Sequence, residues 1–171
     1  MGMAEDCTIG WARVEDLGDV LRIYYENSLE ILGISRIEEM LEYDKKLYGP
    51  AYKFLSPRNL REWYARDGRR KLFVARCQGR VVGFGILHVT GTTGYLEELH
   101  VAKQYRGRGI GTRLLEFFES EAARRGARIL ILEAHEGAIE FFRARGYTPI
   151  RTEKQPYMNK ITYTIMAKSK P

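Results

Sequence analysis

Apolar side chains recur along the chain at two periods, and the change of period predicts where helices and strands lie. After Asp16 they recur three and four positions apart, which predicts a helix that ends near Gly33. From Lys71 onward, alternating apolar, β-branched and aromatic residues predict strands. The predicted helices are 16–33, 35–47, 56–68, 110–126 and 137–145, and the predicted strands are 8–13, 71–77, 80–90, 95–102, 128–133, 147–153 and 160–168.

The order of these elements predicts an α/β chain with a mixed (α+β) sheet. A tight turn at Gln78-Gly79 and a loop at Gly91–Gly94 join neighbouring strands, so the first half of the sheet is expected to be mostly antiparallel. A βαβ unit follows, and helices should cover both faces. The chain has no repeat and no linker-like stretch, which favours a single domain over residues 1–171.

Composition places the chain among soluble globular domains with a substantial core. It has 171 residues, of which 44% are hydrophobic and 29% charged. No apolar run approaches the ~20 residues of a membrane span, and the N-terminus lacks a signal-peptide pattern, so a cytoplasmic location without membrane contact is expected. Cys7 and Cys77 lie far apart without CxxC spacing, which predicts reduced thiols, an inert Cys77 inside a strand and no metal site.

The net charge of +6 raises the question of an anionic partner. Arginines cluster at several places, but the clusters are dispersed and accompanied by glutamates. A solvated surface that partly serves a polyanionic cofactor is therefore favoured over a nucleic-acid interface.

The glycine-rich stretch Tyr105–Thr112 is the strongest chemical signal. Gly107, Gly109 and Gly111 stand between arginines directly before a predicted helix. Amides in the first turn of a helix and the close backbone approach that glycines allow can together hold a phosphate or pyrophosphate. The spacing matches neither a GxxxxGK(S/T) loop nor a GxGxxG fingerprint.

Two motifs instead resemble the GNAT superfamily (GCN5-related N-acetyltransferases). Arg106-x-x-Gly109-x-Gly111 resembles the family signature (Q/R)-x-x-G-x-(G/A). Further on, the chain is similar to the family pattern L-x-V-x-x-x-N-x-x-A-I-x-x-Y-x-x-x-G-F over Ile129–Tyr147, with His135 in place of the asparagine and Phe142 in place of the tyrosine. The resemblance implies the acyl-CoA N-acyltransferase fold, with specific motifs only between about Tyr95 and Tyr147.

The resemblance also implies acetyl-CoA as cosubstrate and a set of residues that would hold it. Backbone groups of Leu99, His100 and Val101 would pair with the pantetheine arm. His135 and Phe142 would lie near the cofactor. The pyrophosphate would meet the backbone amides of the glycine-rich stretch, with Arg106 and Arg108 adding positive charge: Arg106, Gly107, Arg108, Gly109, Ile110, Gly111 and Thr112.

Direct acetyl transfer needs a group that removes a proton from the amine, because a lysine-like amine of pKa ~10.4 is only about 0.04% neutral at pH 7. Glu98, on the strand before the glycines, is the first candidate, and an exposed strand carboxylate is the alternative. His100 is a second titratable group on that strand, with a structural histidine as its alternative. His135 either acts as a base, hydrogen-bonds the cofactor or is a plain loop histidine.

Phe142 cannot protonate the coenzyme A thiolate, as the family tyrosine is proposed to do. Either the thiolate leaves unaided, or Tyr147, Tyr157 or Tyr163 helps, or activity has been lost. The neighbouring Phe141 is expected in the core.

The leading hypothesis is an acetyl-CoA-dependent N-acetyltransferase that works by direct attack in a ternary complex. Its rivals are a non-catalytic acyl-CoA-binding domain, suggested by Phe142 and His135, and a nucleic-acid-associated basic domain. The sequence does not identify the amine acceptor, which is a small molecule or a protein or peptide, and it leaves a homodimer open.

Overall fold

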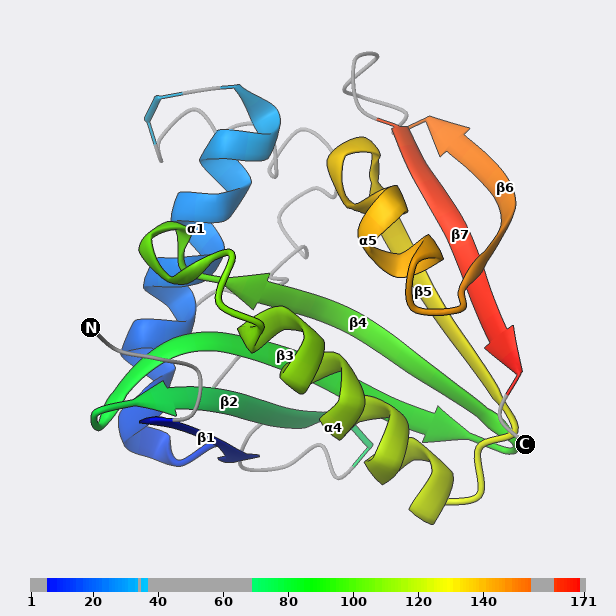
Figure 1. Ribbon diagram of the computed structural model, residues 1–171, viewed down its shortest axis with the longest axis horizontal. Coiled ribbons are helices and arrows are strands. Elements are labelled where there is room, and N and C mark those ends of the chain that lie inside the picture. Colours follow the sequence, from blue (N-terminus) through cyan, green and yellow to red (C-terminus); the bar gives the residue numbers. More distant parts are fainter. Residues whose placement is uncertain (1–5, 34, 37–68, 155–161, 170–171) are drawn as a thin grey trace, which may run out of the picture. The chain divides into compact units, whose positions relative to one another are not determined.

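A computed structural model describes residues 6–33, 35–36, 69–154 and 162–169 (Figure 1). The predicted helices 35–47 and 56–68 lie almost wholly outside the described residues. Short 3₁₀ turns at Val14–Asp16, Lys103–Tyr105 and Glu136–Ala138 accompany the main elements. Those elements are β1 (Cys7–Trp11), α1 (Leu17–Leu32), β2 (Lys71–Cys77), β3 (Arg80–Thr90), β4 (Thr93–Val101), α4 (Ile110–Arg124), β5 (Ile129–His135), α5 (Ile139–Arg143), β6 (Thr148–Lys154) and β7 (Thr162–Ser169).

The strands are hydrogen-bonded in the order β1-β2-β3-β4-β5-β7-β6. β4 and β5 are parallel neighbours joined through α4, which confirms the predicted βαβ unit. The pairs β1–β2, β5–β7 and β6–β7 are antiparallel, so the sheet is mixed as predicted. The turn Gln78-Gly79 lies where the sequence predicts it, and both residues have positive φ, of 52° and 80°, as a tight hairpin requires.

The chain forms two compact units, which share β3, β4 and α4 because each of these elements runs through both. Unit 1 lies within Met1–Ile86 and Glu98–Phe118, and unit 2 within Leu87–Glu97 and Glu119–Pro171. No helix among the described residues is long and apolar enough to cross a membrane.

In unit 1, helices cover both faces of the strands. Phe84 packs with Val20 and Ile23 of α1 in one buried cluster. A side chain at the preceding position, Gly83, would meet Leu114 of α4, and consecutive strand residues point to opposite faces. α1 and the first half of α4 therefore lie on opposite sides of these strands.

The structure contradicts the prediction of free thiols, because Cys7 and Cys77 form a disulfide. The two residues stand directly opposite each other in the antiparallel register of β1 and β2, with their Cα atoms 4.1 Å apart. Cross-strand neighbours at this distance can be bridged. The sequence separation of 70 residues hides this proximity, since it follows from strand pairing alone.

In unit 2, β5, β7 and β6 carry a second core. Leu130, Leu132 and Ala134 alternate inward along β5, and Met166 is fully buried on β7. β5 reaches two residues beyond its predicted end, so His135 is the last residue of a strand rather than part of a loop. Phe141 is only partly buried, with the guanidinium carbon of Arg145 3.7 Å from its ring centre, so its predicted core position is wrong.

Candidate active site

The glycine-rich stretch, in unit 1, forms the turn into α4. Gly107 and Gly109 have φ of 76° and 82°, a left-handed conformation that other residues rarely adopt. No atom would lie within 4 Å of a Cβ at either position, so conformation and open space, rather than packing, favour glycine there. Gly111 differs, because it is the second residue of α4 and has no positive φ.

The start of α4 provides the chemistry expected of an anion site. The carbonyl of Gly109 accepts the first helical hydrogen bond, from the amide of Arg113 at 3.1 Å. Helix geometry leaves the N–H groups of Ile110 and Gly111 without acceptors inside the helix. The first turn carries no acidic residue, so nothing in it opposes a bound anion.

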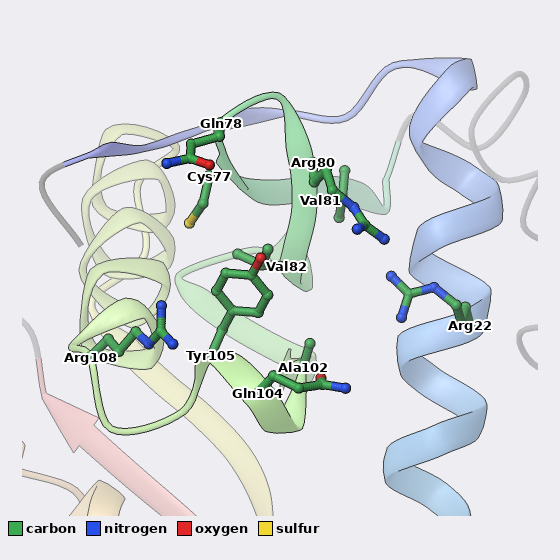
Figure 2. A pocket seen from close by; sticks show the side chains of 10 residues that line it. All are labelled: Arg22, Cys77, Gln78, Arg80, Val81, Val82, Ala102, Gln104, Tyr105 and Arg108. Atoms are coloured by element: carbon green, nitrogen blue, oxygen red, sulfur yellow. The ribbon is translucent and has the colours of Figure 1, made fainter. Parts of the chain in front are cut away.

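A pocket of about 340 Å³ adjoins the 3₁₀ turn that precedes the loop (Figure 2). Arg22 comes from α1, Arg80 from β3 and Arg108 from the loop, and no aspartate or glutamate lines the pocket. Figure 2 shows the side chains of Arg22 and Arg80 extending toward each other. Arg108 lies over the ring of Tyr105, at 5.0 Å. The three guanidinium groups make this side of the loop basic, and Arg22 shares its charge with Asp19 at 3.4 Å and Glu26 at 3.5 Å.

The side chain of Arg106 is bound to α1, which the sequence did not predict. Its Nη1 donates to Glu30 Oε1 and its Nη2 to Asn27 Oδ1, both at 2.7 Å. Its Nε donates to the carbonyl oxygen of Val101 at 3.2 Å. The guanidinium of Arg106 therefore anchors the loop, and its charge is shared with Glu30.

Glu98 and His100 lie together on one face of β4. Glu98 Oε2 is 2.5 Å from His100 Nε2, and both side chains are largely buried, with exposed fractions of 16% and 10%. The His100 ring stacks on Phe84 at 4.9 Å and meets Tyr24 edge-on at 5.6 Å. The ring contacts of His100 are those of a structural histidine. Its hydrogen-bond partner, Glu98, is the carboxylate that the sequence suggests as the base.

In unit 2, the neighbouring carboxylate Glu97 pairs with a different histidine. Its Oε1 lies 2.9 Å from His88 Nδ1, a close contact whose angles do not make a hydrogen bond. The ring of His88 stacks on Tyr95 at 4.7 Å. Each of the two adjacent glutamates therefore has its own histidine.

His135, also in unit 2, caps the 3₁₀ turn Glu136–Ala138. Its Nδ1 accepts a hydrogen bond from the amide of Gly137 at 3.2 Å. An accepting Nδ1 places the ring proton of a neutral histidine on Nε2. In this arrangement His135 is a donor rather than a proton acceptor, which weakens the hypothesis that it is a base.

Phe142 packs in the core of unit 2, with its ring 5.0 Å from Phe141 and 5.8 Å from Tyr147. The Tyr147 hydroxyl donates to Glu119 Oε2 at 3.0 Å. Burial raises the pKa of the Tyr147 phenol far above its ordinary value, and the charge and hydrogen bond of Glu119 raise it further. Tyr147 is therefore a poor candidate for protonating a thiolate. Tyr157 lies outside the described residues.

The sequence reasoning missed Asn27, as it missed the pocket residues Arg22 and Arg80. Asn27 is 6% exposed and contacts Arg106, His100 and Val101. A signal did exist, because Asn27 occupies a core position in the apolar period of α1, four residues after Ile23. A buried polar side chain at such a position needs partners, and here they come from β4 and the loop.

Comparison with known proteins gives a consistent result. The model of the acetyltransferase (GNAT) family matches residues 37–147. An uncharacterized N-acetyltransferase of Methanocaldococcus jannaschii is 30% identical over 143 residues, covering 78% of this chain and 57% of that protein. The thialysine N-epsilon-acetyltransferase of Mus musculus is 30% identical over 87 residues, covering 46% of this chain and 51% of that protein. The chain thus spans little more than half the length of these curated relatives.

Solved structures are similar over nearly the whole chain. The PaiA N-acetyltransferase of Thermoplasma acidophilum, in complex with coenzyme A, superposes with a TM-score of 0.77 at 18% identity, over 96% of this chain and 99% of that one. A GCN5-related N-acetyltransferase of Rhodopseudomonas palustris gives a TM-score of 0.71 at 26% identity, over 95% of both chains. The first likeness, at this identity, concerns the fold.

Proposed function

The chain belongs to the acetyltransferase (GNAT) family, and on that premise we propose that it transfers the acetyl group of acetyl-CoA directly to an amine. The observation that carries the proposal is the glycine-rich turn into α4, where Gly107 and Gly109 are left-handed and the first helical turn lacks acidic residues. Residues 1–171 would act as one N-acetyltransferase domain, because β3, β4 and α4 each run through both units.

The cofactor would lie along the end of β4 and on the loop. Backbone groups of Leu99, His100 and Val101 would pair with pantetheine, and amides of the loop with the pyrophosphate. The guanidinium groups of Arg80 and Arg108 beside the loop, with a smaller contribution from the ion-paired Arg22, would raise the local concentration of a polyanion such as acetyl-CoA.

Glu98 is the proposed base. The amine nitrogen attacks the thioester carbon while Glu98, directly or through water, takes the amine proton; the C–S bond then breaks and coenzyme A leaves as a thiolate. Glu98 is supported by its buried position next to a hydrogen-bond donor, His100. With Phe142 and Tyr147 both packed in unit 2, the thiolate would leave without a proton from either ring. Its pKa, near the ~8.5 of cysteine, permits this.

Glycine variants test the cofactor site. Gly109→Val and Gly111→Val should reduce acetyl-CoA affinity by more than about a hundredfold in calorimetric titration, because a branched side chain blocks approach to the amides. Gly91→Val is the matched control for Gly109→Val. Gly91 also has positive φ, 59°, and open space around it, but lies in the β3–β4 turn. A similar strain there should leave affinity unchanged, and undiminished binding by folded Gly109→Val would remove the basis of the assignment.

An acceptor screen tests the activity. Wild-type protein is incubated with acetyl-CoA and a panel of small amines, peptides and protein N-termini, and both coenzyme A thiol and acetylated product are measured by mass spectrometry. Turnover with any acceptor supports the transferase. Tight acetyl-CoA binding without turnover favours the rival acyl-CoA-binding domain. Salt-sensitive RNA binding that acetyl-CoA leaves unchanged would favour a nucleic-acid protein.

Location and assembly are part of the proposal. We also propose a cytoplasmic location, and the Cys7–Cys77 disulfide provides its direct test, because disulfides are rare in a reducing compartment and therefore count against this location. Trapping thiols by alkylation in intact cells should find Cys7 and Cys77 reduced if the protein is cytoplasmic in a mesophile; an oxidised pair would favour an oxidising compartment. Light scattering decides whether the protein is a monomer or a homodimer.

A further inference from the structure

Asn27 lies at the centre of a chain of hydrogen bonds that joins the glycine-rich loop to Glu98, entirely within unit 1. Its Oδ1 is 2.7 Å from Arg106 Nη2. Its Nδ2 is 3.2 Å from the carbonyl oxygen of Val101 and 3.2 Å from His100 Nδ1. The other ring nitrogen of His100 is 2.5 Å from Glu98 Oε2.

The direction of each hydrogen bond follows from the chemistry of the partners. A guanidinium has only donors, so the atom of Asn27 that faces Arg106 must be the amide oxygen. A backbone carbonyl only accepts, so the atom that faces Val101 must be the amide nitrogen. Both hydrogens of that nitrogen are then assigned, one to Val101 and the other to His100 Nδ1. The amide cannot be flipped without placing donors against donors.

This direction fixes the tautomer of His100. A nitrogen that accepts a hydrogen bond carries a lone pair, so the proton of the neutral ring is on Nε2. That proton points at Glu98 Oε2. Stacking on Phe84 from β3 and the edge contact with Tyr24 from α1 keep the ring in this orientation. Tyr24 is a titratable side chain in contact with His100, and the ion pair of Arg106 with Glu30 lies beyond Asn27.

We propose that Asn27 is a positioning residue for catalysis: it holds His100 as the neutral Nε2–H tautomer, which orients Glu98 without neutralising its charge. The proposal rests on the proposed function, in which Glu98 takes the proton of the amine. A neutral N–H fixes one carboxylate oxygen and leaves the group able to accept a proton. An imidazolium in the same place would stabilise the ionised carboxylate and make it a weaker base.

The tautomer is measured directly in the wild-type protein. The sequence has three histidines, so ¹⁵N NMR with the single variants His88→Gln and His135→Gln for assignment is sufficient. At pH 8 we expect His100 to show a protonated Nε2 and an unprotonated Nδ1. A protonated Nδ1 would overturn the proposal, and this result needs neither turnover nor an Asn27 variant.

Asn27→Asp is the most informative variant because it keeps the oxygen that accepts from Arg106 and replaces the amide nitrogen, which donates to His100 Nδ1 and to the carbonyl oxygen of Val101, with a second oxygen. The carboxylate still accepts from Arg106, and Arg106 Nε still donates to the carbonyl oxygen of Val101, so the loop remains anchored. The new carboxylate oxygen, however, requires a donor from His100 Nδ1. His100 should become doubly protonated in the NMR spectrum. The acidic limb of the pH profile of kcat/KM should move to lower pH, and kcat at pH 8 should fall about tenfold. The KM for acetyl-CoA should change less than about twofold.

The controls separate the inference from the proposed function. Glu15→Gln, at an exposed position of the 3₁₀ turn before α1, should leave both the NMR tautomer and the pH profile unchanged. An Asn27→Asp profile identical to wild type, with a doubly protonated His100, would contradict the positioning role. Wild-type kcat in Glu98→Gln would instead refute Glu98 as the base and leave the tautomer result standing. If Asn27→Asp does not fold, the wild-type tautomer decides.

Discussion

Two largely buried glutamates, one in each unit, have different kinds of partner. Glu98 in unit 1 meets the imidazole Nε2 of His100 at 2.5 Å. Glu119 in unit 2 accepts on a single oxygen from the Tyr147 hydroxyl at 3.0 Å and the Lys168 ammonium at 2.9 Å. Lys168 also donates to the carbonyl oxygen of Arg145, at 2.9 Å. The two carboxylates are similarly buried, with exposed fractions of 16% and 11%.

Burial alone therefore does not distinguish the proposed base Glu98 from the structural carboxylate Glu119. A cation beside a buried carboxylate compensates its charge and makes it half of an ion pair. A neutral donor orients the carboxylate and leaves proton transfer available to it. By this criterion Glu98 is the base candidate, and Glu119 holds the C-terminal strand β7 to α4 within unit 2.

Replacing each carboxylate in turn gives the largest expected effect and tests whether Glu98 and Glu119 differ in function. Glu98→Gln should lower kcat by roughly 10²- to 10⁴-fold, with acetyl-CoA affinity little changed, because the variant cannot accept the amine proton. The loss should shrink at high pH, where the amine deprotonates by itself. Steady-state kinetics between pH 7 and 10 measure both effects, and a wild-type kcat throughout would clear Glu98 of the role.

Glu119→Gln is the matched control for that experiment. It should leave the pH profile of kcat unchanged. It should lower the free energy of unfolding by about 1–3 kcal/mol, because Lys168, which is 27% exposed, loses its counter-charge while keeping some contact with water. Denaturant titration measures the loss. A shifted pH profile in Glu119→Gln would mean that the two carboxylates are not distinct in function.

The two units also differ in covalent cross-linking, because both cysteines of the sequence belong to unit 1. Cys7→Ser with Cys77→Ser should lower the free energy of unfolding by about 2–4 kcal/mol, since the bond closes a long loop in the unfolded chain. Denaturant titration of the double variant and of reduced wild type should agree. An unchanged midpoint would contradict a stabilising bond.

The sequence predicted local structure better than long-range contact. β2 and β3 have the bounds that their alternating patterns indicate, because the Gln78-Gly79 turn punctuates them. The Cys7–Cys77 bond was missed because it depends on the register of two strands that are distant in the sequence. Local patterns report conformation, while pairing partners emerge only from the assembled sheet.

The candidate site shows the same limit. The glycine-rich turn was predicted in place, since positive φ at Gly107 and Gly109 leaves a local signature. The partner of Glu98 was not identified, although both side chains lie on one strand. Asn27 was missed because its role arises from β4 and the loop, which come more than 70 residues later. Phe142 was assigned to the cofactor by resemblance, and that role stays a prediction.

The hydrogen bond from Tyr147 to Glu119 in unit 2 predicts how the free energy of unfolding depends on pH. The folded-state pKa of Tyr147 is raised above the ordinary 10.0, so below pH 10 both folded and unfolded chains keep the proton. Above pH 10 the unfolded chain releases the proton and the folded one retains it. The free energy of unfolding should therefore fall by up to about 1.4 kcal/mol per pH unit. Tyr147→Phe should lack this component, and parallel slopes for both proteins above pH 10 would contradict it.

The smallest expected change in catalytic rate concerns Phe142, whose ring centre lies 5.8 Å from that of Tyr147. Phe142→Tyr adds a hydroxyl at a position that is 6% exposed, so the variant should lose about 1–3 kcal/mol of stability if the hydroxyl finds no acceptor. Its kcat should change by no more than about tenfold, ~1.4 kcal/mol, because a thiolate of pKa near ~8.5 departs without a tyrosine.

The same substitution distinguishes a transferase from a degenerate binder. If wild type turns over, the Phe142→Tyr variant should bind acetyl-CoA with the same affinity in calorimetry and show a similar rate in the coenzyme A thiol assay. Phe141→Tyr is the matched control, because it adds the same hydroxyl to the neighbouring ring, which is only partly buried and already covered by Arg145. A wild type inert with every acceptor, together with a Phe142→Tyr variant active on the same panel, would show that the missing tyrosine had ended catalysis; activity in the Phe141→Tyr control alone would contradict both accounts.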